Sequence, residues 1–248
     1  MKYYFFVTTL SIILSFTNDV SAQENSDFIF RPKVKFDQRT FSGIFVAAGL
    51  NTLSSEYQKY NDVDFEFYRS RFFEIGWLWT TRAFKNHNIL RVRYGIAYQS
   101  NGVRSTRDQI FVKDETQTRL ATFNKQLSKS KFRVDNLVIP LYLEVGPSKN
   151  NTSRTSISFD TTGHFKLGVG GFTGATIHTI QKLKYTEAGE EKKEKLREDL
   201  GVTRFIYGIG AYVGFGSLSI YSKYDLSSLF KNAIPEQHNL SFGLRYDL

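Results

Sequence analysis

Cysteine is absent from this 248-residue sequence, and its absence excludes disulfides, thiolate nucleophiles and cysteine-ligated metal sites together. Proline occurs only four times, whereas phenylalanine occurs 23 times and tyrosine 14 times. Beyond the N-terminal region, no apolar run reaches the roughly 18 residues that a membrane-spanning helix needs. The mean hydropathy of −0.33 is also too polar for a helical membrane protein. A chain rich in aromatic residues and poor in proline is typical of β-strands.

The N-terminus has the three parts of a secretory signal peptide. A short basic start is followed by an apolar run over residues 3–16 and by small residues that predict cleavage after Ala22. The alternative is a single anchoring helix, but the run is short for a bilayer. We therefore expect a signal peptide at residues 1–22, a periplasmic arm at residues 23–40 and one further domain at residues 41–248.

Apolar and polar side chains alternate almost without a break over residues 202–248. In the final segment, every second residue from Leu240 to Leu248 is apolar, and the residues between them, from Asn239 to Asp247, are polar or glycine. A period of two predicts β-strands. Three such segments fill this stretch, each of about ten residues, the length with which a tilted strand crosses a bilayer.

Five earlier segments alternate in the same way, at residues 41–53, 70–83, 90–99, 132–146 and 163–180. Eight strands result, with mostly long links after the odd-numbered strands and shorter links after the even-numbered ones. This is the pattern of outer-membrane barrels. The long link at residues 147–162 breaks the pattern, so ten strands remain an alternative. Pro140 predicts a local bulge, because proline cannot donate to a β-ladder.

Two links carry most of the exposed charge. Residues 100–131 are basic, and their segments 110–112 and 120–123 are weakly strand-like, so we expect this hairpin to extend beyond the membrane. Residues 182–201 mix lysine and glutamate closely and predict either a short exposed helix or a solvated loop.

The two faces of the predicted strands differ in a way that fixes their orientation. One face carries large aliphatic residues with aromatic residues near the strand ends, and the other carries glycine, serine and charged residues. This composition favours lipid outside and a narrow polar interior. We predict an all-β, transmembrane, antiparallel up-and-down barrel of about eight strands. Its interior is expected to hold ion-paired charges from Glu74, Arg82, Arg91, Arg93, Glu144, Lys166, Arg204, Lys223, Asp225, Arg245 and Asp247.

The formal net charge of +9 raises the possibility of a nucleic-acid partner, but export argues against that class. Anionic outer-membrane lipid and lipopolysaccharide are the expected partners of the excess positive charge.

Two resemblances point to the bacterial outer membrane. The C-terminal residues Ser241, Gly243, Tyr246 and Leu248 resemble the signal that barrel-assembly machinery recognises, with Leu248 in place of the usual terminal phenylalanine. The segments 136–144 (NLVIPLYLE), 168–177 (GVGGFTGATI) and 221–232 (YSKYDLSSLFKN) resemble the Bacteroidota family of small outer-membrane barrels that includes PorT. This second resemblance implies an eight-stranded barrel and, for PorT itself, a role in type IX secretion and gliding.

Several functions are compatible with this reading. A structural or machinery-associated barrel that acts through its loops and turns, and that binds other envelope proteins, is the main hypothesis. A small-solute channel is disfavoured because paired charges would plug a narrow interior. An outer-membrane lipid- or peptide-modifying enzyme would use rim residues, and the four histidines at 87, 164, 178 and 238 all fall near strand ends or links. A lipocalin-like soluble binder would need the opposite orientation of the strands. No cofactor, metal or catalytic residue is predicted.

Overall fold

The computed structural model describes residues 39–54, 67–84, 89–105, 108–114, 117–152, 157–160, 163–187, 190–196, 200–232 and 236–248. The expected signal peptide lies outside these residues, as does nearly all of the expected arm. Apart from a single 3₁₀ turn, η2 (Phe67–Arg69), the assigned elements are strands. Within the described ranges, no helix is long and apolar enough to cross a membrane.

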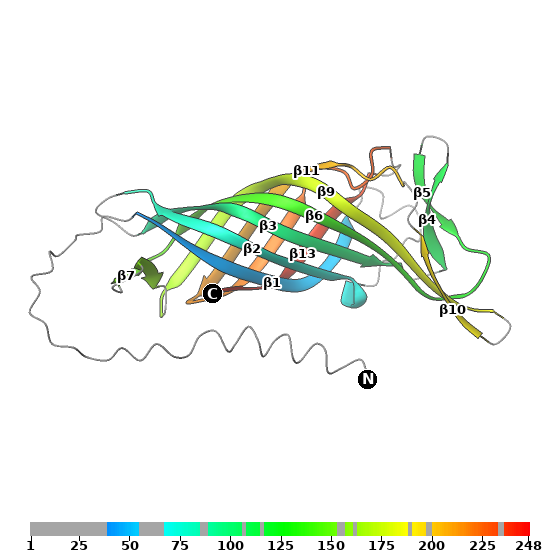
Figure 1. The fold of residues 1–248 in the computed structure, drawn as a ribbon, viewed down its shortest axis with the longest axis horizontal. Coiled ribbons are helices and arrows are strands. Elements are labelled where there is room, and N and C mark those ends of the chain that lie inside the picture. The colour runs from blue at the N-terminus through cyan, green and yellow to red at the C-terminus, as the bar shows by residue number, and fades with distance from the viewer. Residues whose placement is uncertain are drawn as a thin grey trace, which may run out of the picture. The chain divides into compact units, whose positions relative to one another are not determined.

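Eight antiparallel strands close into a barrel (Figure 1). Each strand pairs with the next one in the ring, and the last pairs back with the first. The predicted eight-stranded up-and-down barrel is confirmed. In ring order the strands are β1 (Thr40–Ser54), β2 (Arg71–Arg82), β3 (Leu90–Arg104), β6 (Leu127–Val145), β9 (Phe165–Glu187), β11 (Phe205–Phe215), β12 (Leu218–Asp225) and β13 (His238–Asp247).

The ten-stranded alternative is wrong. The link between β6 and β9 does contain two further strands, β7 (Lys149–Thr152) and β8 (Ile157–Asp160), but they pair only with each other. They lie at the end of the barrel where the short turns are found (Figure 1). One of these turns needs only Gly216 and Ser217 between β11 and β12, and Gly216 adopts a φ of 60°, which glycine accepts without strain.

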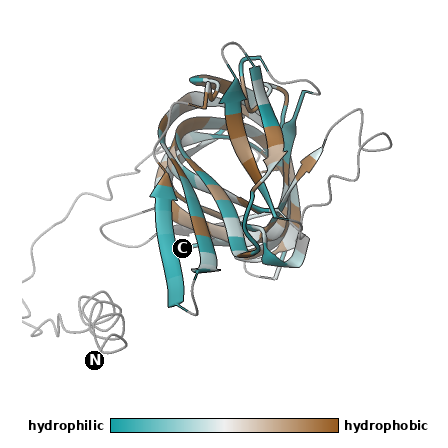
Figure 2. Ribbon diagram, turned by 90° about the vertical axis from the view of Figure 1, so that its right-hand side faces the viewer, coloured by the Kyte–Doolittle hydropathy of each residue, from teal (hydrophilic) through white to brown (hydrophobic). Residues whose placement is uncertain are grey.

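Buried and exposed residues alternate along the strands of the barrel, as the period of two predicts. Figure 2 shows hydrophilic and hydrophobic residues interspersed along the ribbons of these strands. Phe242 and Leu244 of β13 are 43% and 56% exposed, whereas Arg245 between Leu244 and Tyr246 is fully buried. The exposed apolar side chains run around the whole ring. Those of the central belt include Ile75, Trp77, Ile96, Ile139, Leu141, Val169, Ile209, Ile220 and Leu244.

The predicted bulge at Pro140 is wrong. The β3–β6 ladder omits the two positions opposite Pro140 and Ile139 but resumes in the same register, with Tyr94 opposite Leu141 and Ala97 opposite Val138. The missing proline N–H therefore interrupts pairing without inserting a residue. The register of β6 against β9 shifts instead at two other places, between Leu127 and Lys129 and between Asp135 and Asn136.

At the end with the long links, the barrel continues into an extension (Figure 1). Strands β6 and β9 stay paired up to Leu127 and Tyr185, and β10 (Glu190–Leu196) adds to the other edge of β9. The helix or loop expected at residues 182–201 is thus wrong for residues 182–187 and 190–196, which form the two paired strands of a β-hairpin. The weakly strand-like segments at 110–112 and 120–123 form the hairpin of β4 (Gln109–Asp114) and β5 (Gln117–Thr122).

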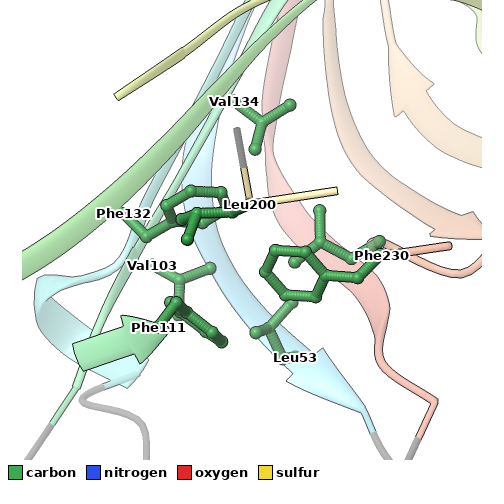
Figure 3. Packing of buried hydrophobic residues seen from close by; sticks show 8 residues of the cluster. Leu53, Val103, Phe111, Phe132, Val134, Leu200 and Phe230 are labelled. Atoms are coloured by element: carbon green, nitrogen blue, oxygen red, sulfur yellow. The ribbon is translucent and has the colours of Figure 1, made fainter. Parts of the chain in front are cut away.

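An apolar cluster lies beneath this hairpin, and we call it the cap (Figure 3). The rings of Phe111, Phe132 and Phe230 have their centroids 5.0 to 5.6 Å apart. The remaining buried members are Leu53, Val103, Val134, Leu200 and Leu229. Hydrogen bonds connect the β4–β5 hairpin to β9 and to the cap. The Phe111 N–H donates to Gln181 Oε1 of β9 at 3.1 Å, and Thr118 Oγ1 donates to the carbonyl of Leu200 in the cap at 2.6 Å.

Candidate functional site

The charged side chains predicted for the interior mostly converge there. Glu74, Arg91, Arg93, Glu144, Lys166, Lys223, Asp225 and Arg245 are buried, and Asp247 and Arg82 are half-buried. Arg204 is the exception and its placement was wrong, because it precedes the first residue of β11 and its side chain is exposed. The inward pattern does not hold beyond the strand end.

Two carboxylates organise the interior at the short-turn end. Glu144 accepts from Arg91 Nε at 2.7 Å, from Arg93 Nη1 at 2.8 Å and from the Tyr212 hydroxyl at 2.7 Å. Asp247 lies at 2.8 Å from Arg93 Nη2, 2.6 Å from Lys166 Nζ and 3.0 Å from Arg245 Nη2. Five strands of the ring therefore meet in one ion-paired layer across the lumen.

Aromatic rings fill the next layer. The Arg245 guanidinium lies 4.3 Å from the centroid of Phe45 and 4.5 Å from that of Tyr212. Glycine makes room for these rings: a Cβ added at Gly168 would lie 2.1 Å from the Tyr212 ring. Tyr142 and Tyr221 share a hydroxyl hydrogen bond of 2.9 Å in the same layer.

A second ion pair follows farther toward the long-link end. Lys223 Nζ lies 3.3 Å from Glu74 Oε2, and both side chains are enclosed, with 1% and 0% exposure. Tyr221 donates to the same carboxylate at 3.1 Å, and Lys223 lies 3.8 Å from the centre of the Phe172 ring. Both charges are therefore removed from water, and their mutual attraction and their contacts with Tyr221 and Phe172 offset the cost of desolvation.

Amides form the last polar layer below the cap. Asn239 Nδ2 donates to Asp225 Oδ2 at 3.0 Å, and Asn51 Nδ2 donates to Asn239 Oδ1 at 3.3 Å. Ser241 donates to Asn51 Oδ1 at 3.0 Å. From one end to the other, the lumen is therefore occupied by ion pairs, rings, amides and finally the apolar cap.

The contacts of His178 differ from those of a catalytic triad. His178 Nδ1 lies 3.2 Å from Asp135 Oδ2, and Ser100 donates to the other oxygen of that carboxylate at 2.6 Å. The carboxylate stands between serine and histidine, whereas a catalytic triad places the histidine between them. His238 contacts the Asp225 backbone carbonyl, His164 is half-buried at a strand end, and His87 lies outside the described residues. Within the described residues, no group of metal-ligating side chains is found either.

The residues of the assembly-signal resemblance all lie on or just after β13. Tyr246 and Leu248 are exposed on the outer face, whereas Ser241 points into the lumen and Gly243 lies between β1 and β12. Their role as a signal stays a prediction.

Comparison with known proteins gives a distant structural likeness only. No protein-family model and no curated protein matches the chain. Two crystal structures of Ail, the attachment invasion locus protein of Yersinia pestis, match with 12% identity and a TM-score of 0.36. Each match covers 84% of this chain and 97% of the Ail chain, and one of those crystals holds the heparin analogue sucrose octasulfate. A superposition this loose transfers no function, so the barrel assignment rests on the strand pairing of the chain itself.

Proposed function

We propose that the protein is an integral outer-membrane barrel that is closed to solutes and presents its extension for binding. The observation that supports it most directly is the continuous exposed belt of large apolar residues around a ring whose charges point inward. Such a belt far exceeds the few hundred Å² of contiguous apolar surface that soluble monomers expose. Aromatic residues at the belt's edge, such as the Trp79–Tyr94 pair with centroids 6.0 Å apart, suit the membrane interface.

Membrane fractionation tests this proposal. We expect the protein in the outer-membrane fraction, released only by detergent, and in a form that runs faster on a gel before boiling than after. Leu141 is 56% exposed at mid-belt, so Leu141→Arg should destabilise the folded barrel in bilayers by roughly 2–4 kcal/mol. Gln117→Arg on the exposed β4–β5 hairpin is the matched control and should change little. Recovery without detergent, with a neutral Leu141→Arg, would instead favour a soluble binder.

Closure to solutes is a separate expectation. Because paired charges, aromatic rings and the cap fill the lumen, liposomes that contain the purified barrel should swell in sugar solutions no faster than empty ones. Swelling above the empty control would favour the small-solute channel. A known porin reconstituted in parallel shows that the assay responds.

The finer role that we propose is that of a component of an envelope machine. The resemblance of segments 136–144, 168–177 and 221–232 to PorT-like barrels supports a secretion or gliding machine in particular. In this chain those segments contribute Glu144, Tyr142 and Lys223 to the lumen and lipid-facing residues to the belt. Residues that contact a partner would therefore lie on the extension or the short turns. Cross-linking in whole cells, followed by identification of the attached proteins, tests this role.

A further inference from the structure

Lysines stand directly opposite one another on the outer face of the extension. Lys184 of β9 is opposite Lys129 of β6 and Lys193 of β10. One step closer to the barrel, Lys182 is opposite Lys131 and Lys195. Directly opposed like charges destabilise a sheet. Two rows of three lysines therefore form at a cost in folding free energy unless an anion lies against them.

These rows lie on the same face as the lipid-facing residues. From the exposed Leu137 toward the extension, every second residue of β6 lies on the same face, and these residues are Asp135, Arg133 and Lys131. On β2, Arg71 comes two residues beyond the exposed Phe73, or about 5 Å along the membrane normal for a tilted strand. The Lys131 side chain extends over Gly102, the residue of β3 that is opposite Arg71. A Cβ added at Gly102 would lie 2.7 Å from Lys131 Cε, so the Lys131 side chain reaches toward Arg71. The cations thus begin at the height where a bilayer passes from hydrocarbon to headgroups.

The acids on this face are already engaged. Asp135 pairs with Arg133 at 3.1 Å and bonds Ser100 and His178. Glu191 pairs with Lys184 and lies 3.9 Å from Lys193. In the described ranges, no carboxylate lies within ion-pair distance of five further cations on this face. We call these five the cation strip: Arg71, Lys129, Lys131, Lys182 and Lys195.

On the opposite face of the extension, a carboxylate is paired with lysines. There, hydrogen bonds from Lys125 and Lys192 lower the pKa of Glu187 to about 2. On the strip, burial first and then repulsion from Lys129 and Arg133 lower the pKa of Lys131. Burial also lowers the pKa of Lys182, again with repulsion from neighbouring cations. The strip is therefore an unbalanced positive surface on the side of the extension that continues the lipid-facing surface.

We propose that the cation strip binds the phosphate groups of lipid A, the phosphorylated anchor of lipopolysaccharide, in the leaflet around the long-link end of the barrel. Phosphate esters carry fixed negative charge at the headgroup level, and lysine binds phosphate as a point charge. Continuity with the belt favours a membrane lipid over a soluble polyanion, because the apolar belt holds the acyl chains directly beneath the cations. The inference rests on the proposed membrane orientation.

The test measures binding of lipid A to the purified full-length barrel in uncharged detergent. The variant Arg71→Gln/Lys131→Gln/Lys182→Gln removes three cations of the strip. Lys113→Gln/Lys192→Gln/Lys231→Gln removes equal charge elsewhere on the extension and loops. Since each cation near a charged membrane surface contributes roughly fivefold in affinity, we expect the strip variant to bind on the order of 100-fold more weakly. The control variant should bind like the native chain.

Three probes decide what is recognised. The proposal would be overturned if the native chain bound dephosphorylated lipid A as tightly as lipid A itself. It would also be overturned if both triple variants lost the same affinity for lipid A. Preference for a soluble sulfated oligosaccharide over lipid A would overturn it in favour of a soluble polyanion. The difference in gel mobility before and after boiling shows that each variant is folded. If a triple variant does not fold, the single variants replace it, and each should lose roughly fivefold in affinity for lipid A. If the native chain is not a membrane protein the proposed function fails, whereas native-like lipid A binding by a membrane-inserted strip variant defeats this inference alone.

Discussion

Replacing Glu74 with leucine should lower the free energy of unfolding by about 3–5 kcal/mol, because it leaves a buried lysine without its anion. Lys223 is 1% exposed, and Glu74 is its only ion-pair partner within the described residues. The substitution also removes the acceptor of the Tyr221 hydroxyl. Urea unfolding followed by tryptophan fluorescence measures the loss. Both tryptophans, Trp77 and Trp79, lie on β2 with Glu74 and report on the same strand.

A second substitution separates the charge effect from a simple packing defect. Adding Lys223→Met to Glu74→Leu should recover most of the lost stability, since apolar replacement of a whole buried pair is often neutral or better. Glu190→Leu on the exposed extension serves as the matched control, because Glu190 is exposed and no cation of the described residues lies within ion-pair distance of it, and it should stay within ±0.5 kcal/mol, as surface changes usually do. Equal unfolding midpoints for Glu74→Leu and the native chain would show that the pair contributes nothing.

Asp247→Asn should have the larger effect, at or above the upper end of that same 3–5 kcal/mol range. Asp247 pairs with Arg93, Lys166 and Arg245, and the neutral amide leaves these cations in one enclosed layer. The other carboxylate of the layer, Glu144, is already engaged by Arg91 and Arg93. Refolding yield in detergent and urea unfolding both measure the change.

The matched control is the same chemical change at another carboxylate of the lumen. Asp225 is buried and bonds Asn239, but no cation of the described residues lies within ion-pair distance of it. Asp225→Asn should therefore cost far less than Asp247→Asn. Removing one cation with Arg93→Met should partly restore the Asp247→Asn barrel. If both asparagine variants lose the same stability, burial rather than cation pairing explains the effect.

The ring and its orientation were predictable because one simple rule covers every strand. A period of two places Leu244 outside and Arg245 inside without knowledge of the neighbouring strands. The rule applies only within a strand. Arg204 was placed wrongly because it lies one residue before β11, and the Pro140 bulge was wrong because the ladder omits pairs instead of adding a residue.

The extension and the cap could not be read from the sequence in the same way. Both faces of β10 are charged from Glu190 to Lys195, so its strand has no hydrophobic period. The cap draws Phe111, Leu200 and Phe230 from three separate polar links, and only chain folding brings them together. The cation strip depends on register, which sets Lys131 opposite Lys182 and which no local pattern specifies.

The seam between β1 and β13 has a consequence for how the barrel is made. Phe45 is opposite Asp247, so the two strands that join there are the earliest and the latest of the ring to be synthesised. Until they meet, an open sheet presents two unpaired edges, which are templates for aggregation and call for shielding by a chaperone. The Arg93–Asp247 pair, which crosses the lumen, forms only when the sheet curls shut. Closure should therefore be a single cooperative event late in biogenesis, and the partly closed barrel should be a short-lived species.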